Sequence, residues 1–290
     1  MGTSSAYGGP GNSTPLIPSW LEPDGEAAPP EPNETSADGD GASDGAPDHP
    51  EQEPLPDVLP NTNRFTVPRT NFTRFVRSGG SDRASLGRAV SGYVSRSSGG
   101  ARNAARRMGS TRRTGRQLLG FLSDVVTQGA RQALSALNLE SLAGRPIDEI
   151  FLGLVDYICP DGGTVDEGIA RDAFIETIAD LVESGITDLD ALTPDQMQTF
   201  FELHTAHAIQ TRICNDIGAQ AILLPEDVRT ATSIQDQIYD FVRRGVADAL
   251  TRSGNAINEL TADNIQQFVD QIYEDAFAIL RSLGEREAVL

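Results

Sequence analysis

The chain has 290 residues, a formal net charge of −19 at pH 7 and no lysine, since all of its basic residues are arginine. The absence of lysine excludes a Walker A phosphate-binding loop and Schiff-base catalysis, which both depend on an amine side chain. No apolar run approaches the roughly 18 residues of a membrane-spanning helix, and two cysteines without a CxxC spacing predict reduced core thiols in a cytoplasmic protein.

Residues 1–60 are predicted to form a long disordered tail. They are rich in Gly, Pro and Ser and carry 12 acidic residues with no arginine, so they cannot bury enough apolar surface to offset the entropy of ordering. An apolar island at residues 15–21 interrupts the tail and contains the only tryptophan of the chain. Because tryptophan is enriched in interface hot spots, the island is predicted to dock onto a partner through Leu16, Ile17 and Trp20; the alternative is a chance cluster.

The first residues of the tail could carry a chemical modification. They lack the charged and apolar regions of a signal peptide, and Ala6 breaks the myristoylation pattern. Removal of Met1 would expose the amine of Gly2, and such an amine is partly unprotonated, and therefore nucleophilic, at cellular pH. Gly2 is thus a candidate modification site.

Residues 61–117 are predicted to form an arginine-rich arm that is partly ordered by a partner or by the rest of the chain. The segment holds 13 arginines against one acidic residue, Asp82, and residues 102–107 could form a short helix. Its charge could pair with nucleic acid, with an acidic protein or with the chain's own acidic parts. Protein contact is favoured because the acidic region downstream would repel phosphate, and nucleic-acid binding is the alternative. The arginines predicted to contact a partner are Arg102, Arg106, Arg107, Arg112, Arg113 and Arg116.

Residues 118–290 show helical periodicity and predict an all-α domain, a bundle of about six helices. Thr164 and Thr193 are each followed three positions later by Glu or Gln, which is the signature of a capping box. Val126 and Val182 are among the residues expected on buried helix faces. The helices are expected at 118–137, 146–158, 164–185, 193–224, 225–252 and 261–284.

Candidate catalytic or metal-binding groups are few. His204 and His207 lie three residues apart on a predicted helix, whereas metal-binding pairs commonly lie four apart, so ordinary core or surface histidines are the better interpretation. Acidic pairs such as Asp166-Glu167 stand at helix starts, where the helix dipole alone favours them. The sequence therefore predicts no metal, no cofactor and no catalytic constellation, and hence a protein that is not an enzyme on its own.

Several features together resemble QatB, a subunit family of the bacterial Qat anti-phage defence system. The likeness is carried by residues 1–11 (MGTSSAYGGPG), by 15–20 (PLIPSW), by the end of the arm at 113–116 (RTGR) and by the helical region from 142–145 (LAGR) onward. The start and the island together are distinctive, whereas the arm alone is not.

The resemblance implies a non-catalytic subunit that is encoded beside an ATPase, a QueC-like nucleotide-handling enzyme and a TatD-like nuclease. The QueC-like partner belongs to a family that acts on deazapurines using ATP, and a terminal glycine on a long flexible tail looks like a substrate for it. The expected function is a scaffold or adaptor in an anti-phage complex, with a deazaguanine conjugated to the amine of Gly2.

Overall fold

The computed structural model describes residues 63–159, 163–218, 225, 227–254, 257 and 260–289. Within these residues the chain is predominantly helical and contains no strand, so the predicted all-α class is confirmed. The predictions for the tail and its island, including Gly2, Leu16, Ile17 and Trp20, lie outside the described residues.

Helices follow one another closely along the described residues. A π-helix, η1 (Tyr93–Ser97), continues directly from α2, and a 3-10 turn, η2 (Glu140–Leu142), separates α5 from α6. The α-helices are α1 (Thr66–Arg77), α2 (Arg83–Gly92), α3 (Ala101–Arg106), α4 (Gly109–Gln128), α5 (Ala130–Ala136), α6 (Ile147–Ile158), α7 (Val165–Glu183), α8 (Pro194–Ile217), α9 (Val228–Ser253) and α10 (Ala262–Glu287).

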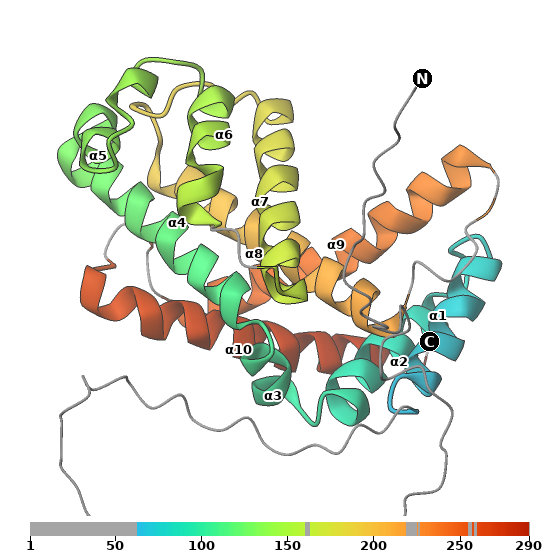
Figure 1. Cartoon of the computed structure of the whole chain (residues 1–290). Coiled ribbons are helices and arrows are strands. Elements are labelled where there is room, and N and C mark those ends of the chain that lie inside the picture. The colour runs from blue at the N-terminus through green and yellow to red at the C-terminus, as the bar shows by residue number, and fades with distance from the viewer. Residues whose placement is uncertain are drawn as a thin grey trace, which may run out of the picture. The chain divides into compact units, whose positions relative to one another are not determined.

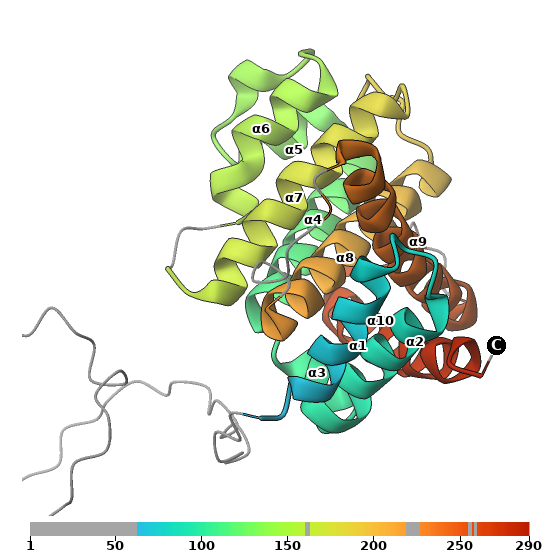
Figure 2. The same ribbon diagram turned by 90° about the vertical axis from the view of Figure 1, so that its right-hand side faces the viewer.

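The last helix, α10, organises one half of this body. It contacts α2, α3, α4 and α9, and Figure 1 shows it running beneath the other helices with α2 and α3 beside it. Figure 2 shows α1, α2 and α3 gathered around α10, with α5 and α6 at the opposite end. The other half is held by α8, which contacts α4, α7 and α9. Helices from the beginning and the end of the described chain therefore share one packing unit.

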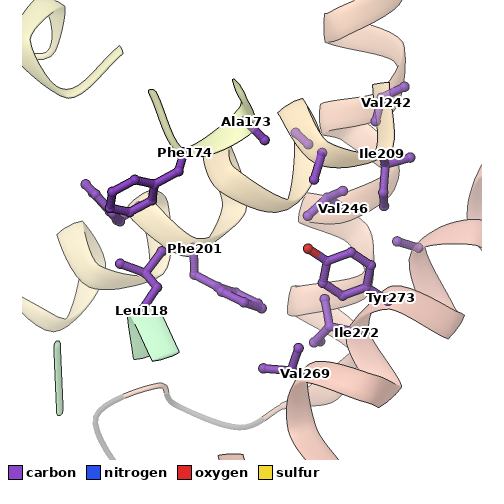
Figure 3. Packing of buried hydrophobic residues seen from close by; sticks show 14 of the residues in the cluster. Leu118, Ala173, Phe174, Phe201, Ile209, Val242, Val246, Val269, Ile272 and Tyr273 are labelled. Carbon is purple, nitrogen blue, oxygen red and sulfur yellow. The ribbon is translucent and has the colours of Figure 1, made fainter. Parts of the chain in front are cut away.

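One continuous hydrophobic core joins the two halves. Figure 3 shows Leu118 of α4, Phe201 of α8 and Tyr273 of α10 within this core. Farther along, the rings of Phe151 and Phe200 stack with their centroids 4.5 Å apart. All five side chains are completely buried, so α4, α6, α8 and α10 form a single domain.

The segment predicted as a partly ordered arm is an integral part of this domain, and the predicted boundary between residues 117 and 118 is wrong because it falls inside α4. The scattered apolar residues of the segment come together on the inner faces of α1, α2 and η1 once these helices form. The short helix predicted at 102–107 is confirmed as α3. The buried apolar residues of the segment include Phe72, Phe75, Val76, Leu86, Val90, Tyr93 and Met108.

The helix ends follow the local sequence signals closely. The capping boxes at Thr164 and Thr193 are both confirmed. The helix predicted to reach residue 224 ends at Ile217, because Gly218 adopts the left-handed conformation that closes a helix. The helix predicted at 118–137 is divided into α4 and α5 at Gly129, whose φ of 88° interrupts the helical backbone.

Helices α2 and α10 cross at a contact between two glycines. A Cβ atom placed on Gly284 would lie 2.5 Å from the backbone oxygen of Gly87, and one placed on Gly87 would lie 2.6 Å from the oxygen of Gly284. Only a residue without a side chain allows this approach, so both glycines are needed for the packing of α2 on α10.

Two residues expected on buried faces are exposed. Val126 of α4 and Val182 of α7 lie on the outer surface, while their neighbours Val125 and Leu181 are buried. Adjacent residues on a helix point about 100° apart, so a run of two apolar residues can place one of them in water.

Candidate functional site

The clearest cluster of predicted site residues lies where α3 and α4 meet α10. Nε of Arg102 lies 3.3 Å from Oε1 of Glu274, and a guanidinium nitrogen of Arg112 lies 2.8 Å from Oδ1 of Asp270. Arg116 reaches the same oxygen of Asp270 at 3.3 Å. The sequence left three kinds of partner for the arginines: nucleic acid, an acidic protein or the chain's own acidic parts. Arg102, Arg112 and Arg116 contact the chain's own acidic residues.

Most of the residues in these ion pairs line an open groove of about 480 Å³. Its lining combines guanidinium groups from α3 and α4 with carboxylates and amides from α10, so it presents donors and acceptors side by side. A polyanion in this groove would meet carboxylates as well as arginines. The lining residues are Arg102, Ala105, Arg106, Arg112, Asp263, Gln266, Gln267, Asp270, Gln271 and Glu274.

The remaining predicted arginines have different surroundings. Burial, together with the charge of nearby Arg64, lowers the pKa of Arg107, which is half-buried. Arg113 is exposed and borders a small cavity with Glu167 at the start of α7. Burial also lowers the pKa of Arg116, against the influence of Asp270. The structure thus brings Arg102, Arg106 and Arg112 together in the groove, joins Arg116 to them through Asp270, and leaves Arg107 and Arg113 outside it.

The α10 residues of the groove were not recognised from the sequence. Asp270 and Glu274 lie one turn apart on the same face of α10. Glu274 therefore pairs with Arg102 of α3 while Asp270 pairs with Arg112 of α4. An acidic i, i+4 pair on an outer helix face was the available signal, but acidic residues are so frequent in this chain that the pair does not stand out.

A second polar cluster is largely buried and connects η1, α7 and α8. The hydroxyl of Tyr93 donates to Oδ2 of Asp216 at 2.9 Å, and Nε of Arg212 donates to the same oxygen at 3.1 Å. Arg212 also lies 3.6 Å from Oδ1 of Asp166. Burial and the charge of Asp216 raise the pKa of Tyr93, so its hydroxyl remains a hydrogen-bond donor. One arginine between two carboxylates fixes the relative positions of these helices.

Asp166 also caps α4 from another helix. The residue that precedes α4, Met108, has no side chain suited to capping. Instead, Oδ2 of Asp166 accepts the backbone N–H of Ser110 at 2.6 Å, and Oδ1 accepts the hydroxyl of Thr111 at 3.0 Å. Sequence reasoning accounted for Asp166 by the dipole of its own helix and missed this role, because the contact joins residues more than 50 positions apart.

The two histidines of α8 occupy unlike environments. Nε2 of His207 lies 2.8 Å from Oδ2 of Asp180, which also accepts the hydroxyl of Tyr239 at 3.0 Å. Burial opposes the ionisation of Asp180, but these two hydrogen bonds, together with the charges of His207 and Arg243, outweigh it and lower its pKa. His204 is completely buried, and neither of its ring nitrogens has a hydrogen-bond partner among the described residues. Within the described ranges, no three His, Cys, Asp or Glu side chains lie close enough to hold a metal ion.

Replacing His204 should reduce the acid sensitivity of the fold. Burial, reinforced by the charge of His207, lowers the pKa of His204 to about 4. Below pH 6.5 the unfolded chain therefore binds a proton at this position that the folded chain refuses, so stability is lost as the pH falls toward 4. Between pH 7.5 and pH 5 the loss should be about 2 kcal/mol larger in the wild type than in His204→Leu, measured by urea unfolding. Parallel pH profiles for the two proteins would contradict the assignment.

Cys159 and the Asp180–His207 pair lack the features of an activated nucleophile. Cys159 is buried, and its burial raises its pKa to about 11, so the thiol stays protonated rather than forming the reactive thiolate. The side chains of Asp180 and His207 have no serine, threonine or cysteine among the hydrogen-bond partners that the structure gives them. None of the described helices is both long enough and apolar enough to cross a membrane.

Comparison with known proteins supplies one finding for the chain. The family model "Qat anti-phage system associated protein QatB" matches residues 99–280, which is more than half of the chain. The matched range runs from just before α3 through most of α10, so it contains the whole groove, while residues 1–20 lie outside it. Comparisons with curated proteins and with solved structures give no match.

Proposed function

The chain belongs to the QatB family of Qat anti-phage proteins, and on that premise we propose that it is a non-catalytic scaffold or adaptor subunit of the defence complex. Its partners would be the QueC-like enzyme and the ATPase of the same system, with the TatD-like nuclease as a further candidate. In this role the helical domain is a platform, and the tail is the part that reaches a partner.

The observation that carries the scaffold proposal is the pairing of the arginine segment with α10. Arg102, Arg112 and Arg116 are already paired with carboxylates of the same chain. A polyanion would have to displace these carboxylates, at a cost in both contacts and repulsion. A protein partner with its own polar groups can instead bind the groove while the internal ion pairs persist.

The tail proposal concerns Gly2. A QueC-like enzyme would conjugate a deazaguanine to its amine, while Leu16, Ile17 and Trp20 would hold the tail near the enzyme and so raise the local concentration of the amine. The support is the small, uncharged sequence of the first residues and the acidic linker of about 40 residues between Trp20 and the body. A flexible linker of that length spans roughly 35 Å.

Intact mass spectrometry of the full chain, co-expressed with the QueC-like partner, tests the Gly2 proposal. We expect an N-terminal peptide heavier than one that has only lost Met1, and we expect loss of the added mass when the partner is inactivated. Trp20→Ala should lower the modified fraction, because it removes the anchor but keeps the amine. A peptide that shows only the loss of methionine in the presence of active partner would refute the modification.

Nucleic-acid binding remains the alternative, favoured by the exposure of Arg106 and Arg113. If the arginines neutralise phosphates, log affinity for duplex DNA should fall with log salt with a slope of about −0.9 per phosphate. We expect no such salt-dependent binding by the chain alone. Salt-dependent binding that disappears in an Arg106, Arg107, Arg112 and Arg113 to alanine variant would replace the scaffold proposal with the alternative.

A further inference from the structure

Helices α6 and α7 together carry an unusual share of the exposed apolar side chains. Of the nine large apolar residues that the described part of the chain exposes, five belong to these two helices, with exposed fractions between 43% and 63%. Scattered exposed apolar residues are ordinary, whereas a contiguous apolar patch marks an interaction surface. The five residues are Leu152, Tyr157, Val165, Ile175 and Val182.

Helix α7 carries apolar residues on its outer side as well as on its inner face. Its inner face is buried in the domain through residues such as Phe174 and Leu181. Its outer face carries Ile175, Ala179 and Val182, all exposed and spaced i, i+4, i+7, so they form one continuous stripe. A helix that borders water on one side normally keeps that side polar, so an apolar stripe on the outer side is unusual. The apolar periodicity of α7 predicted that Val182 is buried. Such a periodicity on an exposed side is therefore typical of a surface that a partner covers.

An acidic edge runs beside this stripe. At 100° per residue, Asp172, Glu176 and Glu183 lie about 60–100° from Ile175, all on the same side of the helix. All three are exposed, and none has an arginine within ion-pair distance among the described residues. A ligand that fits the stripe thus meets unpaired negative charge along one margin.

We propose that the α7 stripe, formed by Ile175, Ala179 and Val182 with its acidic edge, docks an amphipathic helix of a partner protein whose apolar face is flanked by Lys or Arg. Apolar residues of the partner helix cover the stripe, and its basic residues pair with Asp172, Glu176 and Glu183. A second copy of the chain is a poorer occupant, because a two-fold contact would bring two acidic edges together. An anionic membrane surface is repelled for the same reason.

The inference rests on the proposed function, since the partner would be another subunit of the same complex. The test uses the full chain and measures its affinity by biolayer interferometry for the purified QueC-like enzyme, the ATPase and the TatD-like nuclease in turn. Ile175→Glu and Val182→Glu should each weaken binding to the docking subunit at least tenfold. Val228→Glu is the control, because Val228 is a still more exposed valine on another helix, and binding by this variant should equal that of the wild type.

A charge-reversed variant, Glu176→Arg with Glu183→Arg, separates the two parts of the proposal. It should also weaken binding, and the remaining affinity should depend less on salt than that of the wild type. Equal melting temperatures for all variants establish that the domain is intact.

The outcomes separate the docking proposal from the scaffold proposal. Binding by the wild type that neither glutamate variant weakens would overturn the docking face and leave the scaffold role standing. Failure of the wild type to bind any of the three subunits would overturn the scaffold role and the docking face together. Self-association that Val182→Glu abolishes would identify a second copy as the occupant and overturn the heteromeric partner.

Discussion

Replacing Asp166 with alanine is expected to destabilise the helical body by about 3–5 kcal/mol, the usual cost of removing one partner from a largely buried ion pair. The change leaves the guanidinium of Arg212 with only Asp216 and takes the cap from Ser110 and Thr111 at the start of α4. Both losses act on the junction of α4, α7 and α8, so they should appear as a loss of global stability rather than as local fraying.

Urea unfolding followed by circular dichroism measures this effect. Asp166→Asn keeps an acceptor for α4 but loses the charge opposite Arg212, so it should fall between the wild type and the alanine variant. Asp172→Ala is the matched control, because Asp172 lies on the same helix, is exposed and has no ion-pair partner among the described residues; its effect should be within about 0.5 kcal/mol. A stability of Asp166→Ala equal to that of this control would contradict the assigned role.

Gly284→Val should cost about 3 kcal/mol, because the new side chain meets backbone atoms of α2 that no rotamer change can move. The separation of α2 from α10 should also expose the backbone around Arg83 and Arg88, which trypsin would then cleave faster. The urea midpoint and the rate of tryptic cleavage are the two measurements.

The chain provides its own control for the glycine experiment. Gly120 lies within α4, and a Cβ placed there would meet nothing within 4 Å. Gly120→Ala should therefore stabilise the protein, by up to about 1 kcal/mol, through the higher helix propensity of alanine. If Gly284→Val were as stable as the wild type, α2 would not pack on α10 as described.

The helix positions were predictable from the sequence because their signals are local. The capping boxes at Thr164 and Thr193, and the apolar periodicity between them, depend only on residues a few positions apart. The integration of residues 66–117 was not predictable in the same way. Their arginine-rich composition indicates an exposed arm, and their few apolar residues become a core only against α8 and α10, which begin at residues 194 and 262.

The candidate site was also predictable only in part: its arginines could be found from the sequence, but their partners depend on tertiary packing. Charge segregation alone identified Arg102, Arg106 and Arg112, and it included the chain's own acidic parts among their possible partners. It could not single out Asp270 and Glu274 among the many carboxylates of the chain, since that choice depends on how α3 and α4 lie along α10. The capping of α4 by Asp166 of α7 is a tertiary contact of the same kind, and the local sequence pattern does not indicate it.

The pairing of α2 with α10 has a consequence for synthesis on the ribosome. A guanidinium nitrogen of Arg88 donates to the backbone oxygen of Ala288, a contact between residues 200 positions apart. At translation rates of about 5–20 residues per second, α2 waits roughly 10–40 s for its packing partner. During that interval the face of α2 that packs on α10 is uncovered, and Arg102, Arg112 and Arg116 lack their carboxylate partners on α10. We therefore expect the nascent chain to bind chaperones that hold basic, apolar segments until the last helix emerges.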